Sequence, residues 1–230
     1  MNAVVFEKYA LEKTNELFKE HNVVVIVGGT GLYIKAFAEG LDDVPPIDPE
    51  IRKNIIEAYE KNGLSWLQEQ VKLKDPKFYE EGEIQNPQRM MRTLEVMEST
   101  GQSILSFRKG EKSKRDFTII KIGLELPKEE LHKNINERVD KMMNDGLLFE
   151  VQNLLSKKKL NALQTVGYSE LIKHLDEKIS LEMAVDLIKQ NTRQYAKRQI
   201  TWFKKDKEVK WFSPLDVNEI IEFIQGVIEQ

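Results

Sequence analysis

A glycine-rich turn is the first stretch of the chain whose residue types could bind a ligand. Gly28, Gly29, Thr30 and Gly31 follow five consecutive β-branched residues at 23–27. Glycine allows backbone angles that other residues avoid and lets a ligand approach the backbone closely. Ligands of open α/β sheets bind beyond the carboxyl ends of the strands. The turn is therefore either a ligand site or a turn whose glycines serve backbone geometry alone.

A second cluster begins a predicted helix after Asn86 and Pro87. Gln88, Arg89 and Arg92 lie near the amino-terminal end of that helix. Positive charge at this end opposes the helix macrodipole and costs a little stability. This placement suggests that the arginines bind a ligand.

A third cluster places basic residues on one face of a long predicted helix. Lys189, Arg193 and Lys197 recur every four residues and so share a face. Such a face is either a solvated surface or a contact for phosphates. Polar residues suited to phosphate and sugar contacts are interleaved with it: Gln190, Asn191, Thr192, Gln194 and Gln199.

The elements that must position these clusters belong to an α/β fold. The apolar run at residues 23–27 predicts a strand buried in a parallel sheet, and residues 117–126 and 209–212 predict two further strands. Amphipathic helices are predicted at 3–20 and 32–41, from Pro127 onward, at 148–157, 169–176, from Leu181 onward, and at the C-terminus.

Between residues 49 and 112 the pattern is helical throughout, which predicts an all-helical insertion. Helices are expected at 51–62, 64–72 and 87–99, and Asp48 followed by Pro49 is a helix start signal. Residues 1–48 and 113–230 would then form the α/β core.

Composition limits the classes of partner and cofactor. The net charge is −3 and the sequence contains no cysteine, so any basic surface must be local, and disulfides and thiolate metal sites are excluded. The absence of cysteine fits a reducing cytoplasm, which is the expected location. No apolar run approaches the roughly 18 residues of a membrane span. His21, His132 and His174 lack metal-ligand spacing and are expected to be surface or partly packed residues.

Four stretches together resemble one protein family. They are GGTGLY at residues 28–33, NPQRMMRTLEVMESTG at 86–101, INERVDKMMNDGL at 135–147, and VGYSEL with NTRQYAKRQITWF within 166–203. The chain is similar to the tRNA dimethylallyltransferases, and the resemblance spans essentially its whole length. These enzymes transfer a dimethylallyl group from its diphosphate to N6 of the adenosine on the 3′ side of the anticodon. Their fold is a P-loop NTPase-like α/β core, a nucleotide-binding type of fold, with a helical insertion.

The resemblance also implies roles for individual residues. Thr30 would lie near the target nucleotide, and Thr30 and Arg52 would contact the tRNA. Gln88, Arg89 and Arg92 would hold the tRNA from the insertion, and the segment with Gln190, Arg193 and Lys197 would follow its backbone. Arg138 would bind the diphosphate of the donor, because the guanidinium fork suits that anion. The partners implied are the tRNA anticodon stem-loop and dimethylallyl diphosphate, with Mg²⁺ as cofactor and a monomeric enzyme.

The chain also departs from the family pattern. It contains no GxxxxGK[ST] motif, and the general-base aspartate of the family lies in the first βα units, so we expect at least one βαβ unit to precede Met1. That unit would also hold most of the Mg²⁺ ligands. Asn134 stands where many members place an arginine. The chain alone is therefore expected to be catalytically impaired.

Two other functions remain open at this point. The chain could be a non-catalytic protein that binds the anticodon stem-loop, or an adenylate isopentenyltransferase that acts on free nucleotides. The helical insertion with Gln88, Arg89 and Arg92 argues against the latter, because a mononucleotide gives such an arm nothing to hold.

Overall fold

The structure is a computed structural model that describes residues 2–229. Its internal contacts divide the chain into two compact units. Unit 1 contains the residues up to Val25 together with Lys35–Asp116. Unit 2 contains Ile26–Ile34 and the residues from Phe117 onward. The expected division into a core at 1–48 and 113–230 and an insertion at 49–112 stays a prediction.

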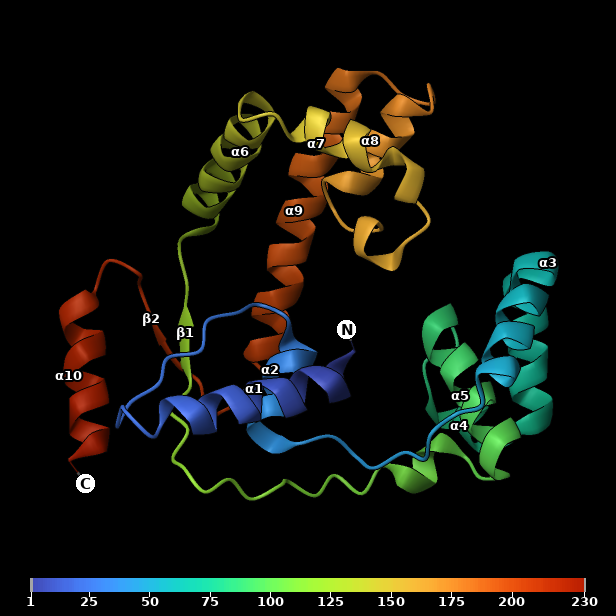
Figure 1. The fold of residues 1–230 in the computed structure, drawn as a ribbon, viewed down its shortest axis with the longest axis horizontal. Coiled ribbons are helices and arrows are strands. Elements are labelled where there is room, and N and C mark those ends of the chain that lie inside the picture. Colours follow the sequence, from blue (N-terminus) through green and yellow to red (C-terminus); the bar gives the residue numbers. More distant parts are fainter. Residues whose placement is uncertain (1, 230) are drawn as a thin grey trace. The chain divides into compact units, whose positions relative to one another are not determined.

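Unit 1 is helical, and most of its helices agree with the sequence prediction. Its elements are α1 (Ala3–Leu17), most of α2 (Gly31–Glu39), α3 (Pro49–Lys74), α4 (Pro76–Glu81), α5 (Pro87–Thr100) and the short 3₁₀ helix η1 (Ile104–Phe107) (Figure 1). The predicted start signal is confirmed, since an Asp48 side-chain oxygen accepts a hydrogen bond from the Glu50 backbone N–H over 2.9 Å.

Two details of unit 1 differ from the prediction. The helices expected on either side of Gly63 form the single helix α3, which kinks where Gly63 adopts a φ of 77°. No helix is predicted between residues 72 and 87, whereas the structure has α4 there, beginning at Pro76. There the buried Asp75 side chain accepts a hydrogen bond from the Phe78 N–H over 3.0 Å, which caps the helix.

The core of unit 1 lies between α3, α4 and α5. Leu67, Phe78, Met90 and Leu94 are at most 1% exposed, and α3 packs alongside α5 (Figure 1). Met90 and Leu94 are four residues apart and so share the face of α5 that is buried in this core.

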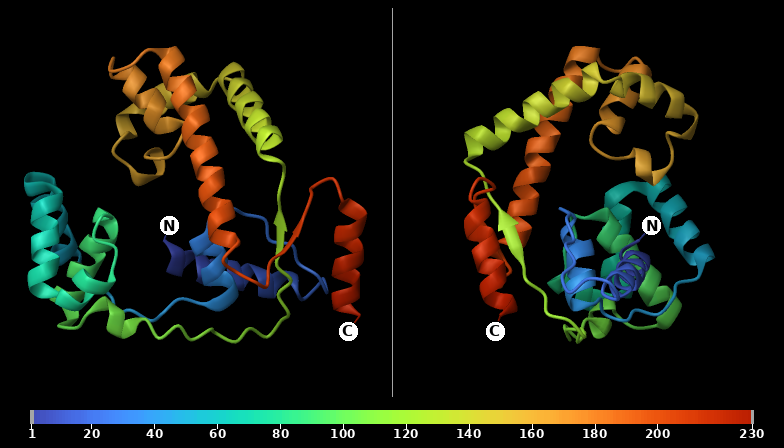
Figure 2. Two further views of the ribbon diagram at one scale, coloured as in Figure 1. Left: turned by 180° about the vertical axis from the view of Figure 1, so that it is seen from behind. Right: turned by 60° about the vertical axis from the view of Figure 1, so that its left-hand side comes forward.

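Unit 2 combines a small sheet with helices. Its elements are β1 (Ile122–Leu124), α6 (Lys128–Asn144), α7 (Leu147–Leu154), the 3₁₀ helices η2 (Leu155–Lys157) and η3 (Asn161–Leu163), α8 (Tyr168–Leu175), α9 (Leu181–Phe203), β2 (Lys210–Phe212) and α10 (Val217–Ile228). The two views of Figure 2 show β1 and β2 side by side. They are parallel, with Ile122 opposite Lys210 and Leu124 opposite Phe212.

The strand predicted at residues 23–27 is wrong. The segment has no regular structure, and Val25 and Val27 are 79% and 90% exposed. A strand needs a neighbour to pair its backbone N–H and C=O groups. Within residues 2–229 the sheet consists of β1 and β2 alone, so this β-branched run has no strand beside it.

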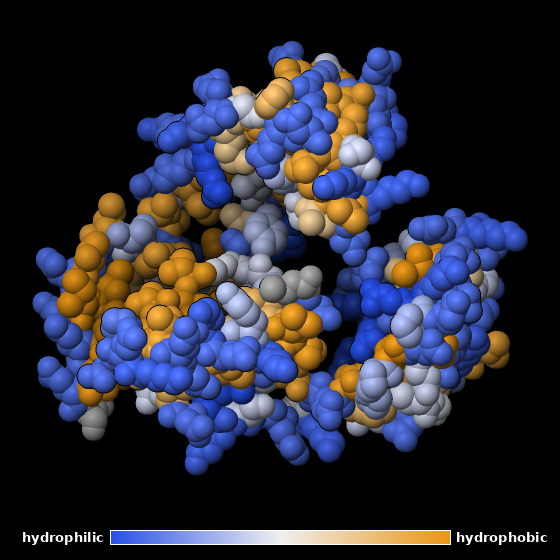
Figure 3. Space-filling model, in the orientation of Figure 1, coloured by the Kyte–Doolittle hydropathy of each residue, from blue (hydrophilic) through white to orange (hydrophobic). Residues whose placement is uncertain are grey.

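A second core joins α6, α7, α8 and α9. Val139, Val151, Leu171 and Ile188 are at most 2% exposed. This core fixes α6, which carries Arg138, against α9, which carries the basic face. Apolar side chains also remain exposed on α10, which is one of the places where Figure 3 shows hydrophobic surface. None of the helices in residues 2–229 is long and apolar enough to cross a membrane.

Candidate functional site

The arginines of α5 lie at the surface, and each has an acidic partner. The Asn86 side chain caps the helix, because its oxygen accepts a hydrogen bond from the Arg89 backbone N–H over 3.3 Å. Arg89 then forms an ion pair with Glu83 over 2.5 Å, while Gln88 is exposed. The exposed Arg89–Glu83 pair is a contact that solvent screens strongly.

Glu95 lies between two arginines that were predicted to contact tRNA, Arg52 and Arg92. Its carboxylate lies 3.7 Å from Nε of Arg52 on α3 and 3.2 Å from a terminal nitrogen of Arg92 on α5. The Glu95 side chain is 4% exposed, whereas the arginine side chains are 58% and 38% exposed. The sequence prediction missed Glu95, although its place three residues after Arg92 was a signal for a pair.

The glycine turn of unit 2 packs tightly against α9. Gln199 donates a hydrogen bond to the Gly29 carbonyl oxygen over 3.0 Å. A Cβ atom on Gly31 would lie 2.3 Å from the Trp202 ring. The side chain of Thr30, between these two glycines, is exposed. The glycines are therefore needed for the close approach of α9, which holds Thr30 in place.

The basic face of α9 is divided along its length. Lys189 pairs with Asp140 over 2.6 Å, and Arg193 donates to the Asn136 side chain over 2.6 Å, so both are tied to α6. Lys197 is exposed and has no ion pair within the part of the chain that the structure describes. Gln190 is also exposed. The C-terminal part of this face, at Lys197, is therefore open to a ligand. Arg193 is partly occupied by its hydrogen bond to Asn136.

Three of the interleaved polar residues have hydrogen-bond partners inside the protein. Asn191 donates to the buried Glu170 carboxylate, the Thr192 hydroxyl donates to the Ile188 carbonyl, and Gln199 bonds Gly29. Glu170 accepts two more hydrogen bonds, from the Gly167 N–H and the Ser169 hydroxyl. A buried carboxylate requires such donors, and the bond from Asn191 joins α8 to α9.

Arg138 lies on a different face of α6 from the residues that contact α9. It is exposed and has no ion pair among residues 2–229. Asn136 is two positions away, which is roughly 200° around an α-helix. The exposed Asn134 lies one turn before Arg138. The guanidinium group of Arg138 is therefore open to an anionic ligand.

The loop between α7 and α8 carries further positive charge. Lys158 forms an ion pair with Asp176 over 2.6 Å. The hydrogen bond from Lys158, followed by attraction to its charge, holds the pKa of the Asp176 carboxyl below its usual value. The neighbouring Lys157 and Lys159 are both exposed.

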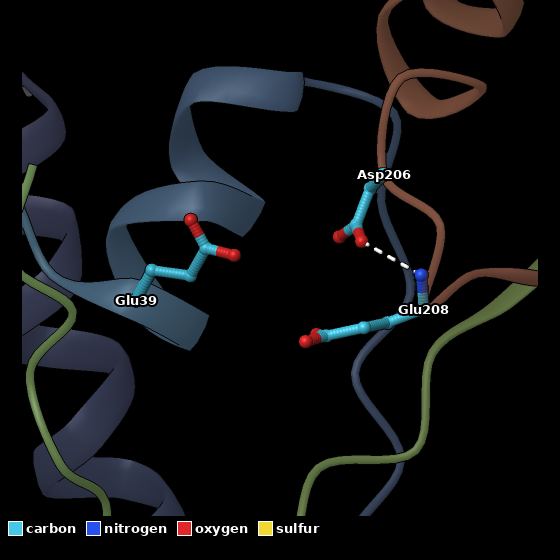
Figure 4. Close-up of side chains that lie close together, drawn as sticks. All are labelled: Glu39, Asp206 and Glu208. Carbon is cyan, nitrogen blue, oxygen red and sulfur yellow. Dashed lines mark hydrogen bonds between the residues drawn. The ribbon is translucent and has the colours of Figure 1, made fainter.

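The neighbouring carboxylates of Asp206 and Glu208 do not form a site suited to Mg²⁺. Both pair with the Lys121 ammonium group, over 2.7 and 2.8 Å. Asp206 also accepts the Glu208 backbone N–H over 3.0 Å, the bond drawn in Figure 4. The Lys121 ammonium group contacts one oxygen of each carboxylate and would repel a divalent cation placed beside it, which disfavours Mg²⁺ there.

A shallow hollow of about 510 Å³ lies at the carboxyl ends of β1 and β2. Its lining includes Glu125, Trp211, Asp216 and Glu219. The position agrees with the rule for ligand sites in α/β sheets. However, it contains none of the predicted site residues.

Comparison with solved structures defines the class of fold. The chain is similar to the full-length tRNA isopentenylpyrophosphate transferase of Bacillus halodurans, with a TM-score of 0.66, 30% identity, and coverage of 99% of this chain and 74% of that chain. It also matches a eukaryotic dimethylallyltransferase acting on tRNA, with a TM-score of 0.76 and 21% identity over 62% of that chain, a likeness of fold alone.

Sequence comparison then gives the family. The model of the IPP transferase family matches residues 1–206. The tRNA dimethylallyltransferase of Christiangramia forsetii is 48% identical over 97% of this chain and 74% of its own length. That of Bacteroides thetaiotaomicron is 44% identical over 97% of this chain and 73% of its own length. The chain belongs to the IPP transferase family.

Proposed function

We propose that this chain acts in tRNA modification, by transferring a dimethylallyl group from dimethylallyl diphosphate to N6 of the adenosine on the 3′ side of the anticodon. The observation that carries the proposal is the 48% identity to a tRNA dimethylallyltransferase over 97% of the chain. Because tRNA is the proposed substrate, the expected location is the cytoplasm.

Each unit would contribute its own contacts to the tRNA. In unit 1, Arg52, Gln88, Arg89 and Arg92 present donors at the surface of α3 and α5. Charged and amide donors of this kind bind backbone phosphates and sugars and hold the RNA in register.

In unit 2, Thr30 would lie beside the target nucleotide, and Gln190, Arg193 and Lys197 would follow the RNA backbone. Support for this comes from the exposure of Thr30, Gln190 and Lys197. Arg193 is half-buried, so its contact with RNA would use the donors that Asn136 leaves unoccupied.

The chemistry requires that the adenine be held outside the stacked loop. The N6 amine attacks the first carbon of the dimethylallyl group, a carbon–nitrogen bond forms, the carbon–oxygen bond to diphosphate breaks, and N6 loses a proton. Positioning and charge stabilisation are what a protein supplies in such a step. Arg138 would bind the diphosphate and stabilise its growing charge as it leaves, because its guanidinium group has no acidic partner in residues 2–229.

Mg²⁺ is the cofactor that family membership leads us to expect. When bound, it would offset the charge of the diphosphate. Asp206 and Glu208 are already paired with Lys121, so we assign them no metal and derive no step through the ion.

Turnover by these 230 residues alone is expected to be slow. They contain no GxxxxGK[ST] motif and span 74% of the length of the Christiangramia forsetii enzyme. By the family resemblance the general-base aspartate lies outside these residues, and a positioned general base typically contributes about 10²–10⁴-fold to a rate. The test is to incubate the purified chain with unmodified tRNA, dimethylallyl diphosphate and Mg²⁺ and to measure modified adenosine. Turnover at the rate of the Christiangramia forsetii enzyme would refute this expectation.

A binding function without catalysis is the second candidate, which the absent phosphate-binding motif favours. It predicts tRNA binding that weakens with salt and with Arg89→Ala or Arg193→Ala. If neither substitution changes the affinity, the proposed tRNA contacts are wrong. Competition by AMP against tRNA would instead support an enzyme that acts on free nucleotides.

A further inference from the structure

Glu95 differs from the other acidic partners of the candidate arginines in its burial. Its side chain is 4% exposed, whereas that of Glu83, the partner of Arg89, is 50% exposed. Removing a carboxylate from water is costly unless positive groups compensate it. Arg52 and Arg92 supply that compensation from two helices that pack alongside each other, α3 and α5.

The same geometry orders the two arginines. Each contact to Glu95 uses one nitrogen, Nε of Arg52 and a terminal nitrogen of Arg92. A guanidinium group has five N–H donors in a rigid fork. Most donors of both groups therefore remain available at the surface, while the carboxylate below restricts where they point.

We propose that Glu95 is a positioning residue that holds Arg52 and Arg92 as a single two-arginine site for backbone phosphates of RNA. The proposal rests on the proposed function, since it assumes that unit 1 binds tRNA. Order gained before binding lowers the entropy lost on binding. The negative charge of Glu95 itself repels phosphate, so ordering and repulsion have opposite effects on affinity.

These opposite effects give the test. Glu95→Gln removes one negative charge without changing side-chain size, and affinity is measured as the Kd of the full chain for a tRNA anticodon stem-loop. If Glu95 positions the arginines, the Kd rises by roughly tenfold despite the added net positive charge, as expected for the loss of charge-assisted order. An unchanged or lower Kd overturns the proposal.

The matched control is Glu98→Gln. Glu98 lies on the same helix and pairs with Lys74 over 2.7 Å, and Lys74 is not among the candidate residues. This variant makes the same change in charge and is expected to leave the Kd unchanged or slightly lower. A rise equal to that of Glu95→Gln would show a general effect of charge on α5 and would also overturn the proposal.

A double-mutant cycle keeps the proposal testable if Glu95→Gln fails to fold. Arg52→Ala, Arg92→Ala and the double variant are compared for binding of the stem-loop. Arginines that act as one site give a double variant whose Kd rises by less than the product of the two single changes. Independent, multiplicative effects would overturn the proposal.

Failure of the proposed function has a different signature. If the unaltered chain does not bind the stem-loop, or if Arg193→Ala in unit 2 has no effect either, the assignment to tRNA is at fault. If the unaltered chain binds and Arg193→Ala weakens binding while Glu95→Gln does not, only the positioning role of Glu95 is refuted.

Discussion

Gln199 donates a hydrogen bond from its side-chain amide to the carbonyl oxygen of Gly29 over 3.0 Å. The two residues are 170 positions apart in sequence. This bond ties the glycine turn to α9, so the helix with the basic face also fixes the position of Thr30. Gln199 is therefore a structural residue of the turn, and its amide is occupied before any ligand binds.

Gly31→Ala should destabilise the protein. The new methyl group would lie 2.3 Å from the Trp202 ring, so the ring must move, which typically costs about 1–3 kcal/mol. Gly226→Ala in α10 is the control, because a methyl group there would meet no neighbouring atom within 4 Å and alanine favours a helix by about 0.8–1 kcal/mol. Urea denaturation measures both variants. Equal effects of the two substitutions would contradict the packing argument.

Arg193→Ala and Lys197→Ala should differ in stability and agree in RNA binding. Arg193 loses its hydrogen bond to Asn136, worth about 1–2 kcal/mol, whereas the exposed Lys197 should change stability by less than about 0.5 kcal/mol. Both variants should bind the stem-loop more weakly. The slope of log affinity against log salt concentration should also fall by about the amount expected for one phosphate contact. The measurements are urea denaturation and Kd as a function of salt. A stability loss for Lys197→Ala equal to that of Arg193→Ala would be inconsistent with the structure.

Arg138→Ala should weaken binding of dimethylallyl diphosphate by roughly tenfold or more, because a bidentate contact to the anion is lost. Stability should hardly change, since Arg138 is exposed and has no ion pair in residues 2–229. Titration calorimetry with dimethylallyl diphosphate measures the affinity. Lys141→Ala, an exposed charge on the same helix, is the control and should bind normally. A normal affinity for Arg138→Ala would rule out its proposed role.

The contribution of Asp176 to stability should vanish in acid. Its pKa is lowered in the folded chain, mainly by the hydrogen bond from Lys158, so the folded state favours the ionised form. That contribution is complete above the unfolded pKa of about 3.9 and is lost as the pH falls through the lower folded pKa. The melting temperature of Asp176→Asn should thus lie below that of the unaltered chain at pH 7, and the difference should shrink below about pH 4. A difference that is constant with pH would refute the ion-pair explanation.

Local chemistry accounts for the parts of the fold that could be predicted. The helix starts after Asp48 and Asn86 follow from side chains that bond nearby N–H groups, and the stripe of Met90 and Leu94 follows from helical spacing. The strand at residues 23–27 was predicted from β-branched residues alone. It failed because pairing in a sheet depends on distant segments.

The sequence by itself determined the family, the order of most helices and the set of candidate residues. Those are properties of residue type and spacing, and the resemblance depends on strings such as QRMMR and TRQYAKRQITWF. Only the tertiary structure decided which candidates are tied to the protein and which are open to a ligand. Arg52 meets Arg92 through Glu95, Arg193 is held by Asn136, and Arg138 remains open, because packing of helices brings distant side chains together.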